Sequence, residues 1–526
     1  MPSRRDFLRA SLLAGGSIML PRWARADRDA FAADAFPSPF LRPFASELPI
    51  PPVPRAVAPF STARAVAPGT VFHELRGREG LHRYHPDLAP TRVWGYEDFH
   101  GDGRAAITPG PTFVSRAGTP MLVRFRNELP ADHRGFGVPN MVVHRHGGEQ
   151  SSEDDGYPED LFRPGESRDY LFPETAHPGD PRETQTTLWY HDHLVYFTAP
   201  NVYRGLAGFF IRHSDFDPGD ESTPGSTGLR LPSGPYDIGL AIQDKRFAPD
   251  GALVYDSNQH DGYLGDTYVV NGAVQPFLRV KRRKYRFRFL CASNARFFEL
   301  FLSTGQPFTQ IATEGGLLER PLQRRSILMS PGERHEVILD FSAYPQGAEI
   351  VLENRLEQKS GRGPDGPAAF PTPILKFIVD GTASDPSEVP FRLREPFPAD
   401  PFPPTVRRTF EFTRRNGAWA VNNELWDPER IVAQPRIEDV EVWTLRNSSG
   451  GWWHPIHIHL TLSQILSRNG RAPDPWDAGM RDMVVLGPND ECEVRVQFKQ
   501  FRGRYVFHCH NVEHEDMAMM ARFDTI

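Results

Sequence analysis

Residues 508–519 place one thiol, three imidazoles and two thioethers in one short stretch, His-Cys-His-Asn-Val-Glu-His-Glu-Asp-Met-Ala-Met. Cysteine, two histidines and a weakly bound methionine form the ligand set of a blue-copper electron-transfer site. The preceding run, 504–507, predicts a strand, in which successive side chains point to opposite faces. Cys509 should therefore face one way, while His508 and His510 face the other. The stretch predicts two metal centres on opposite sides of one strand.

Residues 454–459, His-Pro-Ile-His-Ile-His, show the same alternation. His457 and His459 share one face, and His454 faces the other way because it precedes His457 by three positions. His454 is therefore expected to complete the site of Cys509, with further ligands from the loop that follows the cysteine. The expected ligands of this first centre are His454, Cys509, His514 and Met519.

Two further His-x-His pairs lie far upstream, at 144–146 and 191–193. In a strand, both rings of such a pair point to the same face. One pair is a weak indication in a chain with 19 histidines, whereas four pairs with matching alternation are hard to produce by chance. Eight imidazoles suit a cluster of three copper ions. The expected ligands of this second centre are His144, His146, His191, His193, His457, His459, His508 and His510.

The four motifs resemble those of the multicopper oxidases, the family that includes laccases and bilirubin oxidases. The stretches 265–272, Gly-Asp-Thr-Tyr-Val-Val-Asn-Gly, and 284–289, Lys-Tyr-Arg-Phe-Arg-Phe, are most similar to the bacterial spore-coat laccase and bilirubin oxidase branch. The resemblance implies about four copper ions, one of type 1, one of type 2 and two of type 3. It assigns type 2 to His144 and His457, type 3 to His146, His191, His193, His459, His508 and His510, and type 1 to His454, Cys509 and His514, with Met519 axial.

Two carboxylates accompany the motifs. Asp155 lies nine residues after His146, and Glu515 directly follows His514. Both match acidic positions with a proton-delivery role in the family, and the reduction of O2 consumes protons. The alternative is that they are ordinary carboxylates that support metal ligands or lie on the surface. The resemblance favours Asp155 and Glu515 as catalytic residues.

The resemblance implies an oxidase that takes single electrons from phenolic, aromatic amine or tetrapyrrole donors and reduces O2 to two waters. A copper-free scaffolding protein on the same fold is disfavoured because no ligand is missing. A copper nitrite reductase would have two domains and would not need four histidine pairs. A cuprous oxidase for copper tolerance usually carries a methionine-rich insert, whereas this chain has ten methionines, clustered only at 517–520.

Period-two runs separated by Gly, Pro, Asn and Asp predict an all-β chain, for example at 121–126, 440–445 and 492–498. The length favours three or four domains. The resemblance implies three cupredoxin-like Greek-key β-sandwiches. The predicted divisions are a first domain at 27–215, a linker at 216–233, a second domain at 234–380, a proline-rich linker at 381–404 and a third domain at 405–526.

The motifs are divided between the outer domains, two in the first and two in the third. The histidine-rich centre should therefore form between these domains, while the cysteine centre lies within the third. The middle domain contains none of the motifs and is expected to act as a spacer that shapes the substrate surface.

The first 26 residues carry export signals. Ser-Arg-Arg-Asp-Phe-Leu at 3–8 is a twin-arginine signature, an apolar run follows at 10–20, and Ala-Arg-Ala at 24–26 fits a cleavage site. The mature chain is expected to begin at Asp27, to lack a membrane span and to be periplasmic or secreted.

The remaining composition limits the partners. The net charge of −7 without a long block of like charge disfavours nucleic acid. The expected partners are a small electron donor and O2. The chain is expected to be a monomer. Cys291 and Cys492 lie in strand-like runs and are most simply buried thiols, although a disulfide between them stays open.

Overall fold

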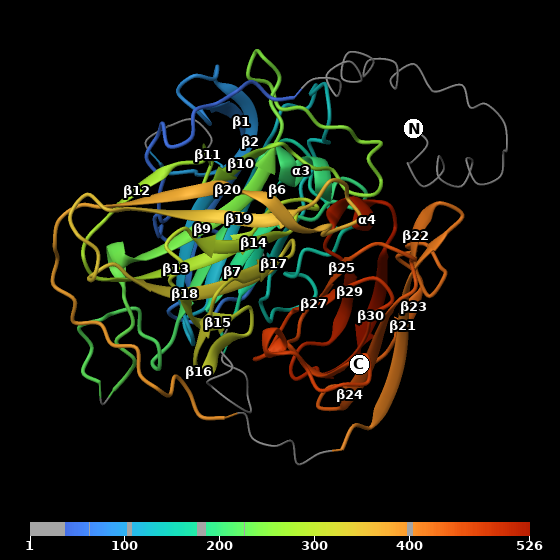
Figure 1. Cartoon of the computed structure of the whole chain (residues 1–526). Coiled ribbons are helices and arrows are strands. Elements are labelled where there is room, and N and C mark those ends of the chain that lie inside the picture. The colour runs from blue at the N-terminus through green and yellow to red at the C-terminus, as the bar shows by residue number, and fades with distance from the viewer. Residues whose placement is uncertain (1–36, 63, 102–107, 176–185, 226, 397–402) are drawn as a thin grey trace.

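The computed structural model describes residues 37–62, 64–101, 108–175, 186–225, 227–396 and 403–526. The export signals at 1–26 lie outside these residues. Figure 1 shows that the described chain is built almost entirely of strands. Six sheets pair into three β-sandwiches, which confirms the predicted all-β fold. The short helices are α3 (Thr198–Arg204), α4 (Val512–Asp516) and the 3-10 turns η3 (Gly234–Tyr236) and η4 (Pro475–Asp477).

The first sandwich pairs a sheet of order β2-β1-β4-β6 with a sheet of order β3-β8-β7-β5. Aromatic rings fill the space between them, as in the contact of Tyr96 with Tyr190, whose ring centroids are 5.2 Å apart. The strands are β1 (Val71–His82), β2 (Thr91–Asp98), β3 (Gly110–Arg116), β4 (Met121–Glu128), β5 (Val143–His146), β6 (Ser167–Phe172), β7 (Thr187–Asp192) and β8 (Ala207–His213).

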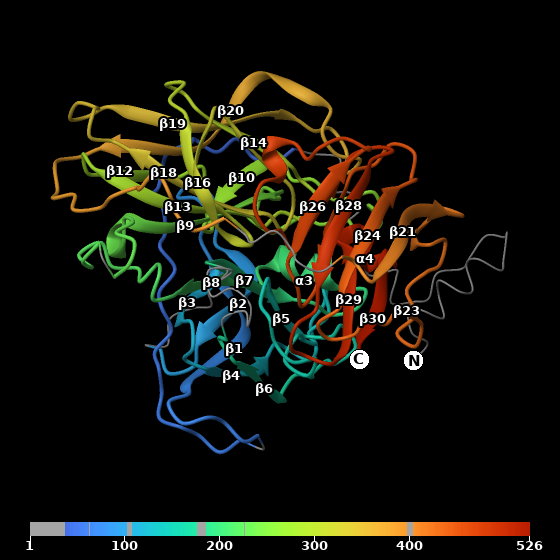
Figure 2. The same ribbon diagram turned by 90° about the horizontal axis from the view of Figure 1, so that it is seen from below.

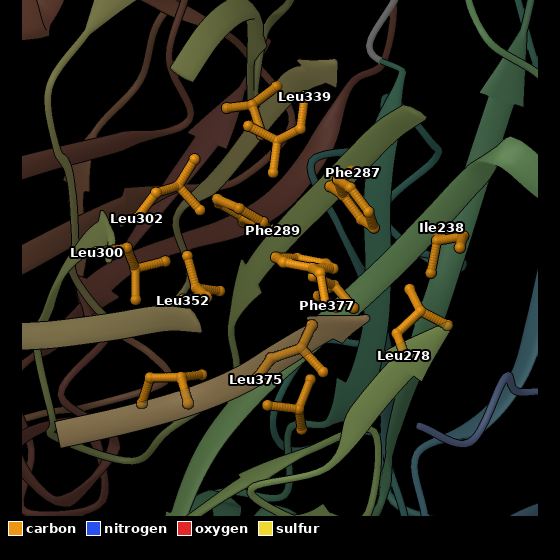
Figure 3. Packing of buried hydrophobic residues seen from close by; sticks show 14 of the residues in the cluster. Ile238, Leu278, Phe287, Phe289, Leu300, Leu302, Leu339, Leu352, Leu375 and Phe377 are labelled. Atoms are coloured by element: carbon orange, nitrogen blue, oxygen red, sulfur yellow. The ribbon is translucent and has the colours of Figure 1, made fainter. Parts of the chain in front are cut away.

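The middle sandwich pairs a seven-stranded sheet, β11-β10-β9-β13-β18-β15-β16, with a five-stranded sheet, β12-β20-β19-β14-β17. Figure 3 shows its core, in which Phe287 and Phe377 meet from the two sheets with centroids 5.1 Å apart. The strands are β9 (Asp237–Lys245), β10 (Thr267–Val270), β11 (Ala273–Val274), β12 (Phe277–Val280), β13 (Lys284–Cys291), β14 (Phe298–Leu302), β15 (Phe308–Thr313), β16 (Gly316–Arg324), β17 (Ile327–Met329), β18 (Arg334–Asp340), β19 (Glu349–Glu357) and β20 (Gly366–Val379).

The third sandwich pairs two five-stranded sheets, β22-β21-β24-β28-β26 and β23-β30-β29-β25-β27. Trp443 and Phe507 meet between them with centroids 5.6 Å apart. The strands are β21 (Val406–Arg415), β22 (Ala418–Val421), β23 (Ile431–Ala433), β24 (Val440–Asn447), β25 (His454–Ile458), β26 (Ser463–Arg468), β27 (Met483–Leu486), β28 (Glu491–Gln497), β29 (Gly503–Cys509) and β30 (Met520–Thr525).

The three sandwiches share local rules of construction. In β28, every second residue is buried, as expected of a strand with one face on a core. A parallel strand pair recurs in each unit, β1 with β4, β9 with β13 and β21 with β24. The predicted domain limits stay predictions, although the described parts of 216–233 and 381–404 contain no strand.

The third sandwich lies beside both of the others, with α3 and α4 near the place where they meet (Figure 2). Asp516 of α4 accepts hydrogen bonds from the backbone amides of Thr198 and Ala199 in α3, at 2.9 and 3.0 Å. The two helices thus fix the first sandwich against the third, close to the histidine motifs.

Two smaller expectations are also answered. Cys291 and Cys492 are buried free thiols, so no disulfide joins them. Among the described residues, no helix has the length and apolar character needed to cross a membrane.

Candidate metal centres

A thiol and two imidazoles converge beside β25 and β29. These strands are antiparallel, with Ile456 opposite Cys509. The Sγ of Cys509 lies 3.4 Å from Nδ1 of His454 and 3.5 Å from Nδ1 of His514. The two Nδ1 atoms are 3.1 Å apart, and all three side chains are buried. We call His454, Cys509 and His514 the thiol site.

The other nitrogens of the two thiol-site rings have fixed partners. Ser449 Oγ lies 2.8 Å from Nε2 of His454, and the carbonyl of Asp261 lies 3.1 Å from Nε2 of His514. A carbonyl only accepts, so Nε2 of His514 carries the proton and Nδ1 is free to bind a metal. Burial lowers the pKa of His454 to about 3. Both rings are therefore prepared as neutral ligands.

The three methionines near the C-terminus have different surroundings. Met520 packs in a cluster with Tyr157, whereas Met517 and Met519 belong to the same buried cluster as Cys509. The carbonyl of Met519 also accepts the backbone amide of Cys509 at 3.1 Å. This placement supports Met519, the residue chosen by its spacing in the family, over Met520 as the thioether of the thiol site.

Replacing Met519 with leucine should raise the reduction potential of the thiol-site copper while the blue absorption survives. Leucine nearly conserves the volume but removes a weak thioether donor that supports the oxidised ion. A redox titration followed by the blue band measures the shift. Met517→Leu and Met520→Leu are the controls and should leave the potential almost unchanged. A shift in a control with none in Met519→Leu would mean that the axial assignment is wrong.

The eight remaining motif histidines converge on the opposite side of β29, between the first and third sandwiches. The Nε2 atoms of His144 and His457 are 3.4 Å apart. Nε2 of His508 lies 3.3 Å from that of His193 and 3.2 Å from that of His459. All eight are buried. We call the following set the histidine cluster: His144, His146, His191, His193, His457, His459, His508 and His510.

Backbone carbonyls orient cluster rings. Nδ1 of His144 donates to the carbonyl of Asp155 at 2.5 Å. Nδ1 of His457 donates to the carbonyl of Asp482 at 3.0 Å. Because a carbonyl only accepts, each ring presents an unprotonated Nε2 to the other. Such outer hydrogen bonds are the usual means of fixing the tautomer of a metal-binding histidine.

The cluster contains buried nitrogens without a hydrogen-bond partner among the described residues. They include Nδ1 of His146, Nε2 of His191 and both ring nitrogens of His510. Buried polar atoms without a partner cost folding free energy. Because these imidazoles face one another, a bound cation would satisfy their unpaired nitrogens. Imidazole nitrogens suit copper, and the residues fit the ions that the resemblance implies. Donor atoms lie within 4.8 Å of one another in the groups His144–His146–His191, His144–His457–His459, His193–His459–His508 and His454–Cys509–His514.

Asp155 lies against the cluster. Its Oδ2 is 2.7 Å from Nδ1 of His459, and its Oδ1 accepts a hydrogen bond from Nε2 of Gln150 at 2.8 Å. Burial raises the pKa of Asp155 to about 7, although the Gln150 hydrogen bond opposes the shift. The carboxyl group therefore lies where it can both orient a ligand and hold a proton.

Glu515 lies at a different edge of the cluster. Its Oε2 is 3.0 Å from Nδ1 of His508, and its Oε1 is 3.3 Å from Nδ1 of His193. Thr198 donates to Oε1 at 2.7 Å. Burial alone would raise the pKa of Glu515, but its electrostatic contacts with His508 and His193 lower it to about 2. One carboxylate thus connects histidines of the first and third sandwiches.

Several residues beside these centres have no signal in the sequence. Asp482 contacts two cluster histidines, and Arg334 of the middle sandwich binds Asp482. Asn294, also in the middle sandwich, donates to the carbonyl of Ala199 and to Glu513. The middle sandwich supplies no motif histidine, yet it reaches both outer sandwiches at the centres and is more than the expected spacer. Only the three-dimensional pairing identifies these residues.

Two segments, residues 104–215 and 399–526, match the multicopper oxidase family. They contain all four histidine motifs. A bilirubin oxidase of Albifimbria verrucaria is 35% identical, covering 96% of this chain and 85% of that protein. A laccase of Bacillus stratosphericus is 32% identical, covering 92% of this chain and 99% of that protein.

The fold leads to the same group of proteins. The crystal structure of a laccase from Pediococcus acidilactici superposes with a TM-score of 0.76 at 27% identity, covering 93% of this chain and 95% of that one. Such a match includes all three sandwiches, and the buried histidine groups are consistent with copper sites. The chain therefore belongs to the multicopper oxidase family.

Proposed function

We propose that the protein is a laccase-like oxidase that takes single electrons from small aromatic donors at the thiol site and reduces O2 to two waters at the histidine cluster. One observation carries this proposal. Cys509 lies in the thiol site, while its neighbours lie in the cluster on the other side of β29, His508 beside His459 and His510 against the rings of His146 and His191. When bound, copper supplies the one-electron redox chemistry and the affinity for O2.

The protein contributes a fixed path and a dry environment. The backbone joins Cys509 directly to two cluster residues, so the separation of the two centres is set by covalent geometry. Every motif histidine is buried, which strengthens electrostatic interactions inside the site and excludes side reactions with water. Formation of two waters from O2 needs four electrons and four protons, and we assign the proton transfer to Asp155 and Glu515, which contact His459 and His508.

Asp155→Asn and Glu515→Gln should retain the copper complement but slow turnover by roughly 100-fold or more, the typical contribution of a positioned proton donor. The amides conserve shape but can neither accept nor release a proton at these positions. Steady-state oxygen uptake and copper per chain measure the two properties. Asp154→Asn is the matched control, because this buried neighbour pairs with Arg64 and the amide of Leu171. Normal turnover in both test variants would leave the two acids with a supporting role only.

The surroundings of the thiol site are aromatic and basic, and they run from the buried Trp419 to the half-buried Trp452. Trp419 packs on His514 with ring centroids 4.0 Å apart, and Trp452 packs on Trp419 at 5.3 Å. The guanidinium groups of Arg362 and Arg414 lie 4.4 and 4.6 Å from the ring centre of the half-buried Trp452. These contacts support an aromatic electron donor, since clustered aromatic rings favour aromatic partners and the cations favour acidic substituents.

The methionines support organic donors over Cu(I). Thioethers are the ligands that suit Cu(I), but every methionine among the described residues is buried in the protein interior. They are Met121, Met141, Met329, Met480, Met483, Met517, Met519 and Met520. The described part of the chain therefore presents no exposed thioether to which Cu(I) could bind.

Oxygen uptake with a panel of donors tests the proposed function. A phenolic donor such as a dimethoxyphenol, an aminophenol or bilirubin should give a higher kcat/KM than Cu(I), because the entry surface is aromatic. A Cu(I) value well above that of every organic donor would instead indicate a cuprous oxidase. Absence of oxygen uptake with all donors in the copper-loaded protein would favour a scaffolding role.

We also propose that the chain is exported by the twin-arginine route to the periplasm or the exterior. The support is the order of signals at 3–8, 10–20 and 24–26. This route carries folded proteins, which suits a protein whose cofactor is buried between two sandwiches.

A further inference from the structure

An arginine of the middle sandwich forms an ion pair with an aspartate of the third sandwich, directly beside the histidine cluster. Arg334, the first residue of β18, donates from Nη1 and Nη2 to Oδ1 and Oδ2 of Asp482 at 2.7 and 2.5 Å. Its Nε donates to the carbonyl of Thr187, in β7 of the first sandwich, at 3.1 Å. Both charged side chains are buried. One guanidinium group thus joins all three sandwiches.

Asp482 meets two cluster histidines through different atoms. Its Oδ1 lies 3.3 Å from Nε2 of His146, and its backbone carbonyl lies 3.0 Å from Nδ1 of His457. The two rings stack with centroids 3.6 Å apart. Because both oxygens are acceptors, His146 holds its proton on Nε2 and His457 holds its proton on Nδ1. The opposite nitrogen of each ring is then free, and Nδ1 of His146 has no hydrogen-bond partner in the described structure.

The backbone leaves room for this pair. Gly147 directly follows His146 and has a φ of +87°, and a Cβ built on it would collide with the guanidinium of Arg334 and the carboxylate of Asp482. Glycine alone combines this conformation with so close an approach. The segment that carries His146 is therefore shaped around the ion pair.

We propose that Arg334 and Asp482 are positioning residues of the histidine cluster. The bidentate guanidinium holds the Asp482 carboxylate at the position from which it accepts from His146, and the same contact fixes the backbone carbonyl that orients His457. Asp482 thereby fixes opposite tautomers in His146 of the first sandwich and His457 of the third. The inference rests on the proposed function, since it concerns the binding of copper. Loss of such an outer partner typically weakens metal affinity or activity by about 10- to 100-fold.

A neighbouring ion pair provides a control that distinguishes positioning of the histidines from general stabilisation of the interface between the sandwiches. Arg481 donates to both carboxylate oxygens of Glu314 at 3.0 and 2.9 Å. This pair is also buried and also joins the third sandwich to the middle one. Among the described residues, neither side chain has a hydrogen bond or ion pair with a cluster histidine. Arg481→Met is therefore a control of the same burial, charge and location between sandwiches.

The test compares the copper-loaded Asp482→Asn, Arg334→Met, Arg334→Lys and Arg481→Met proteins with the wild type. Type 2 and type 1 copper are followed by electron paramagnetic resonance, type 1 by the blue band, and cluster affinity by the chelator concentration that removes half of the cluster copper. In Asp482→Asn and Arg334→Met, the type 2 hyperfine splitting should change and that concentration should fall about 10- to 100-fold. The blue band should stay. Arg334→Lys, which keeps the charge, should change less.

The control defines the opposite result. Arg481→Met should lower the unfolding temperature and leave the type 2 signal and the chelator concentration at wild-type values. Wild-type signals in Asp482→Asn and Arg334→Lys would overturn the proposal, even if Arg334→Met fails to fold. An equal change in Arg481→Met would also overturn it, since general loosening would then explain the effect. A wild-type protein that binds no copper would contradict the proposed function instead, before any variant is compared.

Discussion

Replacing Cys509 with serine should abolish the blue absorption and the oxidase activity. The thiolate is the soft ligand that gives a blue-copper site its character, and Cys509 also begins the covalent path to His508 and His510. Removing a direct ligand should cost more than the roughly 10- to 100-fold typical of an outer partner. Absorption spectroscopy, copper per chain and oxygen uptake measure the loss. The histidine cluster should keep its copper, because its donors lie on the other side of β29.

The fold should survive this change. A buried hydroxyl in place of the thiol costs at most about 1–3 kcal/mol, and the two sheets of the third sandwich share many other buried residues. Cys492→Ser is a matched control, because Cys492 is a free buried thiol in the same core cluster. It should remain blue and active. A blue, active Cys509→Ser protein, or a colourless Cys492→Ser protein, would contradict the proposed role of the thiol site.

Removal of copper should lower the stability of the whole protein. Eight buried imidazoles from the first and third sandwiches face one another, and several of their nitrogens have no other partner among the described residues. A metal that binds only the folded state stabilises it by about 4 kcal/mol for each site at a free concentration 1,000-fold above its Kd. Calorimetry of the copper-loaded and chelated forms should therefore show a clearly lower Tm for the chelated form.

Readdition provides the control for this experiment. Cu(II) should restore the higher Tm, whereas Mg2+ should not, because Mg2+ prefers oxygen ligands in octahedral geometry. Equal unfolding temperatures of the loaded and chelated forms would mean that the imidazoles do not hold the outer sandwiches together through a metal.

The division of ligands between the two centres could be predicted from the sequence because strands alternate with a period of two. At the end of β29, this period alone separates Cys509 from His508 and His510. The structure places Cys509 with His454 and His514, and it places His508 and His510 among the cluster histidines. The same rule separated His454 from His457. The choice among the late methionines needed spacing in the family, and packing adds that Met520 belongs to another buried cluster.

The supporting residues could not be predicted in this way. Arg334 and Asp482 are separated by 148 positions, and no periodicity links residues in different sandwiches. Asp261 acts on His514 through its backbone carbonyl, so its side-chain type carries no signal. Long-range pairing and backbone contacts are properties of the assembled fold. The residues that act through them could therefore not be predicted from the spacing of the motifs.

Asn294 has a consequence for protein engineering by domain exchange. It donates to the carbonyl of Ala199 in the first sandwich and to Glu513 in the third, and its own carbonyl accepts the amide of Val512. A chimera that takes its middle sandwich from a relative must therefore supply this asparagine, together with Arg334, at matching positions. The contacts of Asn294 and Arg334 with both outer sandwiches must therefore be exchanged together with the middle sandwich, which is not an independent module.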